Sequence, residues 1–275
     1  MVRGLIKRLW MTVLLSIFVC SFFSAHSVAA ERYRVEPEKS ALLLSGGAIL
    51  WTAGLYIDGR NKVPLTLPDI SALSEGNLNP LDRKFAGFWS PGADNASDVL
   101  VAAMAVLPAA LMSLPEISKH RGPLALMYAE TFLFAMGGAA LAKGMADRPR
   151  PFVYAANPDV PAGAKLDADA ARSFYSQHTA LAFAAAFFTC TVFSDYYPDS
   201  KWKIKAWAAA VGGAAAVGTL RIASGRHFPT DVITGAAVGG FTGYLIPRLH
   251  KTGGRIALRA LLGINSTCIL VTVKY

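Results

Sequence analysis

Six long apolar runs constrain the fold of this chain more than any other feature of its sequence. Each has 15 to 19 residues, at or just below the roughly 17–25 that a helix needs to cross a bilayer. Gly and Ala are abundant in the runs, as expected where helices approach closely in lipid. The runs are 41–57, 99–115, 124–142, 179–194, 206–220 and 232–247. They predict an all-α fold, a multi-pass transmembrane helical bundle.

The composition of the whole chain suits a membrane protein. Hydrophobic residues make up 53% of the chain and charged residues 16%, against about 25% charged in ordinary soluble domains. The mean hydropathy of +0.38 also fits a very apolar soluble helical protein, which is the alternative. The net charge of +9 favours an anionic partner such as anionic lipid or a phosphorylated substrate. No Lys- and Arg-rich run interleaved with aromatic residues occurs, so nucleic acid is not expected as a partner.

The segment 1–30 has the pattern of a secretory signal peptide. Arg3, Lys7 and Arg8 precede an apolar stretch, and small residues at 27–30 precede Glu31. An uncleaved membrane anchor is the alternative, because the apolar stretch is long. Outside this segment the cysteines are Cys190 and Cys268, so neither a disulfide framework nor a metal cluster is expected.

Basic residues gather in alternate connections between the runs. The clusters are Lys119 and Arg121, then Lys201, Lys203 and Lys205, then Arg248, Lys251 and Arg255. The positive-inside rule places these three connections in the cytoplasm. The connections 143–172 and 221–231 then face outward. With the leader ending on the outer side, the run 41–57 is expected not to cross the membrane.

Three charged islands interrupt this apolar chain, and the first is KGMADRPRP. Lys143 and Arg150 are seven residues apart and would share a face if both lay on a helix. Two cations held together suit the oxygens of a phosphate, with Arg offering a planar pair of donors. The alternative is an ordinary charged helix end at the membrane interface.

The second island places a serine and a histidine at the start of an apolar run. Ser176 is predicted to be the N-cap of the helix and His178 to lie in its first turn. The N-terminus of a helix is a natural anion site, and a histidine there can donate a proton to a departing oxygen. A capping serine beside an interfacial histidine is the alternative.

The third island, LRIASGRHFPTDV, carries Arg221, His227 and Asp231. Pro229 suits the first position of the following helix, so His227 precedes that helix and Asp231 lies in its first turn. An Asp near a His can accept the N–H of one ring nitrogen and leave the other as a nucleophile. An ordinary polar turn at the interface is the alternative. Together, the islands describe a phosphate site with a nucleophile and an acid.

These motifs resemble the type 2 phosphatidic acid phosphatase (PAP2) superfamily, which includes class A bacterial acid phosphatases and vanadium haloperoxidases. The family's K-x6-RP motif is matched by 143–151, its PSGH motif imperfectly by 175–178, and its SR-x5-H-x3-D motif by 220–231 with Leu220 in place of Ser. The resemblance implies a helical PAP2/haloperoxidase-like core over about 99–247 and leaves both ends of the chain unexplained.

The resemblance also implies a role for each matched residue. His227 would attack phosphorus and form a phosphohistidine, oriented by Asp231. His178 would protonate the leaving oxygen and then activate water. The residues that would bind the phosphoryl oxygens are Lys143, Arg150, Ser176, Gln177 and Arg221. Neither a metal nor a cofactor is expected, because the cations stabilise the developing charge.

Two departures fall in the second motif. Tyr175 replaces Pro, and Gln177 replaces a Gly whose backbone approaches the phosphate. A side chain at position 177 is expected to crowd the site or to require an unfavourable backbone angle, and so to retune or weaken activity.

The predicted function is a membrane phosphatase acting on a phosphorylated lipid, with lipid A, undecaprenyl diphosphate and phosphatidylglycerol phosphate as candidates. It would lie in a bacterial inner membrane with its site facing the periplasm. The alternatives are a soluble periplasmic acid phosphatase for small phosphomonoesters and a non-catalytic binder or transporter of phospholipid. The predicted organisation is a signal peptide or anchor (1–30), an N-terminal segment with a periplasmic loop (31–98), a PAP2-like phosphatase domain (99–250) and a C-terminal tail (251–275).

Overall fold

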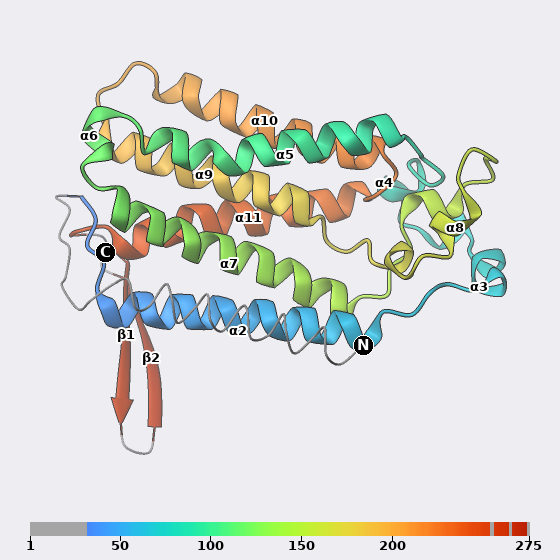
Figure 1. The fold of residues 1–275 in the computed structure, drawn as a ribbon, viewed down its shortest axis with the longest axis horizontal. Coiled ribbons are helices and arrows are strands. Elements are labelled where there is room, and N and C mark those ends of the chain that lie inside the picture. The colour runs from blue at the N-terminus through green and yellow to red at the C-terminus, as the bar shows by residue number, and fades with distance from the viewer. Residues whose placement is uncertain (1–31, 254–255, 264–265, 274–275) are drawn as a thin grey trace.

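The computed structural model describes residues 32–253, 256–263 and 266–273, and the predicted signal peptide lies outside them. Within this part of the chain, six long helices lie side by side (Figure 1). They are α2 (Pro37–Asn61), α5 (Pro91–Leu111), α7 (Arg121–Met145), α9 (Gln177–Tyr196), α10 (Lys203–Ala223) and α11 (Pro229–His250). All except α11 are long and apolar enough to cross a membrane. The predicted fold, a multi-pass helical bundle, is confirmed.

Short elements connect the long helices or follow them. They are α3 (Leu67–Ala72), η1 (Glu75–Asn77), α4 (Pro80–Arg83), α6 (Pro115–Ser118), η2 (Pro151–Tyr154), α8 (Ala162–Lys165) and η3 (Ala168–Ala171). The tail forms an antiparallel hairpin of β1 (Ile256–Gly263) and β2 (Ser266–Val273), with Ile256 opposite Val273. Figure 1 shows α3, α4 and α8 at one end of the bundle and α6 at the other.

Helix α11 packs against α9 through a stripe of glycines at spacing i, i+4, i+8. A Cβ atom on Gly235, Gly239 or Gly243 would meet a backbone carbonyl oxygen of α9 or its N-cap at 2.5, 2.0 or 2.3 Å. Such close contact between backbones is how helices associate in lipid, where apolar burial between helices supplies little driving force. The stripe therefore sets the relative position of two helices that begin at the same end of the bundle.

Helix α2 packs in the same way against α7, and this corrects one expectation. A Cβ on Gly54 would lie 2.5 Å from the Leu141 nitrogen, and one on Gly137 would lie 2.8 Å from the Trp51 nitrogen. The helix runs beside α7 along the bundle (Figure 1) and is one of the five candidate spans. The expectation that 41–57 does not cross is therefore not supported, because small residues pack the helix along α7 and it is as long and apolar as the other candidate spans.

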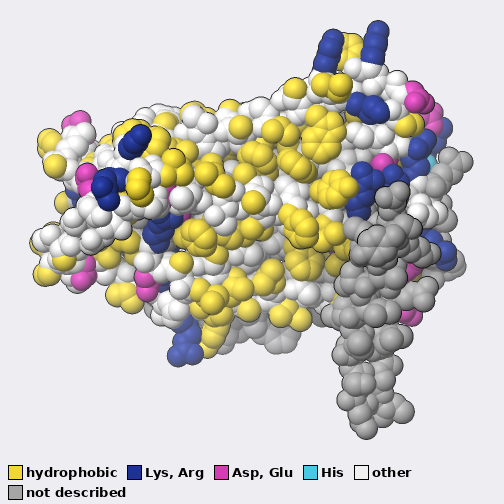
Figure 2. All heavy atoms as spheres, turned by 180° about the vertical axis from the view of Figure 1, so that it is seen from behind, with side chains coloured by type: hydrophobic (Ala, Val, Ile, Leu, Met, Phe, Trp, Pro, Cys, Tyr) yellow, Lys and Arg dark blue, Asp and Glu magenta, His cyan; other side chains and the backbone are white. Residues whose placement is uncertain are grey.

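The outer surface of the bundle is apolar over its middle. Large hydrophobic side chains are exposed there on several helices, including Ile49, Val99, Val106, Ile233 and Phe241. Figure 2 shows hydrophobic side chains across the middle of one face, with charged side chains toward its two ends. An exposed apolar band between two charged ends is the surface expected of a protein surrounded by lipid.

Candidate active site

The three charged islands meet at the end of the bundle where α3, α4 and α8 lie. The first follows the C-terminal end of α7, the second opens α9, and the third joins α10 to α11 (Figure 1). Gly225 makes the last connection possible: its φ is +74°, and a Cβ there would lie 1.8 Å from the carbonyl oxygen of Phe88. This tight turn places His227 just ahead of Pro229, which begins α11 as predicted.

His227 is a neutral imidazole in which Nδ1 donates a hydrogen bond and Nε2 keeps a free lone pair. It is 1% exposed, and its Nδ1 lies 2.7 Å from the carbonyl oxygen of Ser173. A carbonyl only accepts hydrogen bonds, so Nδ1 carries the proton and Nε2 keeps its lone pair. Burial holds the pKa of His227 well below its ordinary value, and the charges of Arg150, Arg221 and Lys143 lower it further. The ring therefore stays neutral at physiological pH.

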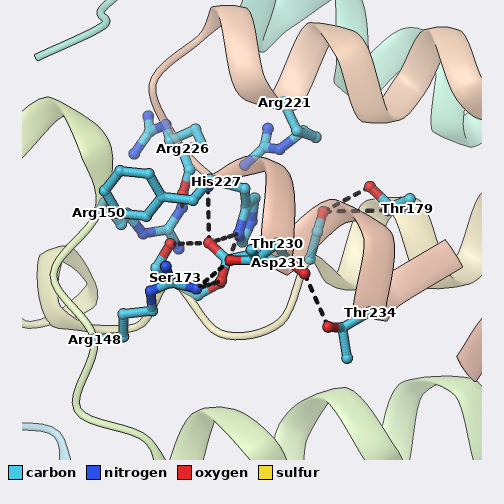
Figure 3. Close-up of polar contacts among 12 residues, drawn as sticks. Arg148, Arg150, Ser173, Thr179, Arg221, Arg226, His227, Thr230, Asp231 and Thr234 are labelled. Carbon is cyan, nitrogen blue, oxygen red and sulfur yellow. Dashed lines mark hydrogen bonds and ion pairs between the residues drawn. The ribbon is translucent and has the colours of Figure 1, made fainter. Parts of the chain in front are cut away.

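Asp231 makes no hydrogen bond to His227, contrary to the expectation from sequence. Its nearest oxygen lies 3.9 Å from Nδ1. The carboxylate instead accepts hydrogen bonds from the backbone N–H of Phe228 (2.8 Å) and from the hydroxyl of Ser173 (2.5 Å), and it pairs with Arg148. An Asp in the first turn satisfies the free N–H groups of its own helix. Asp231 thus holds Ser173, whose carbonyl holds His227 (Figure 3).

Arg148 and the buried Asp82 form a support for this turn that the sequence did not reveal. Arg148 reaches Asp82 of α4 at 2.6 Å, and the Thr230 hydroxyl donates to the same carboxylate at 2.6 Å. Burial raises the pKa of Asp82, but hydrogen bonds from Thr230, Asn79 and Arg148 outweigh it and hold the pKa below its usual value. The carboxylate is therefore ionised and fixes α4 over the start of α11.

Arg150, Arg221 and Arg226 lie around His227 (Figure 3). Arg150 is 3% exposed and pairs with Asp169 at 2.5 Å, while Arg221 is 5% exposed and pairs with Asp94 at 2.6 Å. Arg226, which the sequence did not single out, binds Asp94 through two nitrogens, at 2.9 and 2.6 Å. The cations are thus held in place by carboxylates.

Lys143 and Arg150 do not share a helical face, because α7 ends at Met145. Lys143 lies in the last turn of α7, and its ammonium has no hydrogen bond or salt bridge among the described residues. Arg150 is instead positioned by the loop, where its backbone N–H donates to the Ala170 carbonyl at 2.8 Å. The two cations still converge, since both act on His227 through their charge.

The second island begins α9 as predicted, with Ser176 as its N-cap. The Ser176 hydroxyl lies 2.8 Å from the Thr179 hydroxyl, and its backbone N–H donates to the Asp231 carbonyl at 3.1 Å. Gln177 does not need the unfavourable backbone angle expected of it, because no described residue other than glycine has a positive φ. Its amide points to the sulfur of Met136, at 3.4 Å. Position 177, the first of α9, therefore accommodates a side chain that points away from the phosphate site.

His178 lies in the first turn of α9, and its Nε2 is 2.8 Å from a carboxylate oxygen of Asp98. This partner, together with Asp94 and Ser97, comes from the first turns of α5, ahead of the apolar run at 99–115. Ser97 accepts from Arg221 at 2.9 Å. The sequence did contain a signal: two Asp four residues apart lie on one helical face and precede a hydrophobic run. No group of three or more metal-binding side chains occurs among the described residues.

A comparison with known families agrees with this geometry. The family model of the PAP2 superfamily matches residues 124–255, from the first turn of α7 to just beyond α11. This part of the chain, just under half of it, matches the PAP2 superfamily. The PAP2 region carries every predicted site residue, whereas α5, which contacts His178 and Arg221, lies outside it, as do α2 and α4.

Among solved structures, a transmembrane PAP2-type phosphatidylglycerolphosphate phosphatase from Bacillus subtilis is similar to the chain. The two are 21% identical with a TM-score of 0.42, and the match covers 76% of this chain and 94% of that one. No curated protein matches the sequence significantly.

Proposed function

We propose that the chain is a membrane phosphatase that removes phosphate from a phosphorylated lipid through a phosphohistidine intermediate. The observation that carries the proposal is His227, a buried neutral imidazole with Nδ1 bound to a carbonyl and Lys143, Arg150 and Arg221 around it. A neutral nucleophile among fixed cations suits attack on a phosphate dianion, because the cations stabilise the charge that the transition state spreads over the phosphoryl oxygens. The match of residues 124–255 to the PAP2 superfamily supports the same reaction.

The reaction takes two displacements at phosphorus. In the first, Nε2 of His227 forms a bond to phosphorus, the bond to the leaving oxygen breaks, and His178 gives that oxygen a proton. In the second, His178 takes a proton from water, the water oxygen attacks phosphorus, and the P–N bond breaks to release phosphate and free His227. Lys143, Arg150 and Arg221 hold the phosphoryl oxygens through both steps, so charge stabilisation needs no metal.

A lipid substrate is favoured by where the site lies. The cations sit at one end of a bundle whose middle is apolar on the outside (Figure 2), so a headgroup phosphate at the membrane surface would be level with them. Lipid A, undecaprenyl diphosphate and phosphatidylglycerol phosphate all present phosphate at that level. The same exposed apolar band disfavours a soluble phosphatase.

The test is a phosphate-release panel on purified protein in detergent, with these three lipids, phosphatidic acid and a soluble phosphomonoester. We expect release from at least one lipid at a higher kcat/KM than from the soluble ester, unchanged by EDTA. Loss of activity in EDTA would contradict the metal-free mechanism. A protein that binds the lipids but releases no phosphate would be the non-catalytic binder instead.

We further propose that the site faces the periplasm of a bacterial inner membrane. The basic clusters that include Lys119, Lys201 and Lys251 lie at the opposite end of the bundle from the site, beside α6 in Figure 1. The positive-inside rule assigns that end to the cytoplasm. Tyr33 lies there too, paired with Lys251 and bound to Asp195 at 2.8 Å. If residue 33 is cytoplasmic, a periplasmic peptidase does not cleave the chain at position 30, and a leader that crosses outward from the cytoplasm would also leave residue 33 on the wrong side.

Single cysteines introduced at the two ends test this orientation in spheroplasts. Asp159→Cys at the site end is expected to react with a membrane-impermeant maleimide at once, because Asp159 is exposed there. Glu116→Cys, exposed at the opposite end, is the matched control and should react only after permeabilisation. The reverse pattern would place the site in the cytoplasm and restore the cleaved signal peptide.

A further inference from the structure

The first turns of α5 bring a carboxylate to the histidine that is the proposed acid. Asp98 lies 2.8 Å from Nε2 of His178 and 3.7 Å from the Arg221 guanidinium. The Asp98 side chain is 57% exposed and that of His178 30%, so the pair lies at the open edge of the site rather than in its core. Residue 98 lies outside the part of the chain that matches the PAP2 superfamily.

The ionisable groups that face His178 come from three helices and from the turn before α11. Lys143 of α7 and Arg221 of α10 act on the ring as cations, and Asp98 of α5 acts as an anion. Asp94, one turn earlier on α5, is paired with Arg221 and Arg226. His227, in the turn before α11, is neutral. Asp94 is thus already paired, and Asp98 is the carboxylate that offsets the cations at the His178 ring.

This charge balance matters because a general acid must carry a proton to give one. Two neighbouring cations disfavour a third positive charge on the His178 ring, and a carboxylate at hydrogen-bond distance favours it. The same contact fixes the ring, since the N–H at Nε2 points to a defined acceptor. The cations that bind phosphate would otherwise disable the acid that the reaction requires.

We propose that Asp98 is a positioning residue that orients His178 and favours its protonated form for delivery of a proton to the leaving oxygen. This inference rests on the proposed phosphatase function. As the phosphorus–oxygen bond breaks, the leaving oxygen takes a proton from His178, whose ring becomes neutral. When water attacks the phosphohistidine, a proton from that water returns to His178 and restores the starting state. Asp98 accepts from the ring throughout and takes no proton.

The inference also predicts which substrates depend on Asp98. An alkoxide is a poor leaving group and needs the proton, whereas p-nitrophenolate leaves without it. Asp98→Asn keeps the size of the side chain and removes its charge. In the full-length protein in detergent, we expect this variant to lose roughly 10-fold or more of kcat/KM on an alkyl phosphomonoester lipid near neutral pH, since a general acid contributes about 10²–10⁴-fold. The loss on p-nitrophenyl phosphate is expected to be small.

The pH profile gives a readout that a purely structural role would not move. The rate falls as pH rises past the point where the acid loses its proton, so the alkaline limb should shift to lower pH in Asp98→Asn. Asp98→Glu should restore much of the wild-type profile. Asp159→Asn removes an exposed carboxylate at the same end and should leave the profile unchanged. An unmoved alkaline limb, an equal loss on both substrates, or a lower KM as the only change would each overturn the inference.

Histidine NMR separates this inference from the proposed function. The chain has 5 His, and His178→Asn identifies the signal of that residue in ¹³C-histidine-labelled protein. The His178 signal should titrate at lower pH in Asp98→Asn than in the wild type, whether or not the protein turns over a lipid. If the wild type releases no phosphate, the proposed function fails while this titration still tests the contact. If it is active but the signal does not shift, only the role of Asp98 fails.

Discussion

His227→Ala is expected to lower phosphate release by at least about 10³-fold, because removal of a covalent nucleophile leaves only binding and charge stabilisation. The wild-type Nε2 carries the lone pair that attacks phosphorus, and no other described imidazole is held in the same way among the cations. Phosphate release from the best lipid of the panel measures the effect. Brief incubation with ³²P-labelled substrate should also give an acid-labile phosphoprotein in the wild type and none in the variant.

Two controls keep this result interpretable. His120→Ala makes the same change at the opposite end of the bundle and should leave turnover within about 2-fold of wild type, as is usual for substitutions away from a site. His227→Gln can still donate to the Ser173 carbonyl, so it separates loss of the nucleophile from loss of that buried contact. Hydrolysis by His227→Ala at the wild-type rate would show that the nucleophile is assigned wrongly.

Gly239→Val is expected to have the largest effect on stability, about 3 kcal/mol or more, at the upper end of the usual cost of overpacking. A Cβ at this position would lie 2.0 Å from the Ala180 carbonyl oxygen, and neither the backbone of α9 nor that of α11 can yield without a shift of the whole helix. The expected result is a large drop in the thermal unfolding temperature of the detergent-solubilised protein.

The same substitution at Gly212 is the matched control. Gly212 lies inside α10, where nothing lies within 4 Å of the added Cβ, so Gly212→Val should change stability by less than about 1 kcal/mol. Any Gly239→Val protein that folds should also lose phosphatase activity, because α9 carries His178 and α11 begins two residues after His227. Equal melting temperatures for the two variants would mean that the glycine stripe does not set the packing of these helices.

Residues of α2 and α4, outside the PAP2 region, hold the loops of the site in place. Arg172 is 1% exposed and pairs with Asp58 of α2 at 3.3 Å, and it also contacts the Asn61 carbonyl. It directly precedes Ser173, which holds His227. The C-terminal end of α2 thus braces the loop that orients the proposed nucleophile, just as α4 braces the start of α11 through Asp82.

Local features of the site could be predicted from the sequence because they depend on neighbours along the chain. The cap at Ser176, the helix start at Pro229 and the position of His227 just ahead of it all follow from the hydrogen-bonding needs of a helix N-terminus. The prediction failed for the hydrogen-bond partner of Asp231, because more than one nearby donor can bind its carboxylate. Asp231 was expected to serve His227 four residues away, but its carboxylate satisfies the N–H of Phe228 and the hydroxyl of Ser173 instead.

By itself, the sequence determined that the chain is a multi-pass helical bundle with three charged islands at one end, since apolar run length and charge alternation are properties of single segments. Only the tertiary structure decided which carboxylates hold those islands. Asp98 meets His178 across 80 residues, Asp94 meets Arg221 across 127, and Asp82 meets Thr230 across 148. Such contacts depend on how glycine-lined helices pack against one another, and the packing brings together helix ends that no local pattern connects.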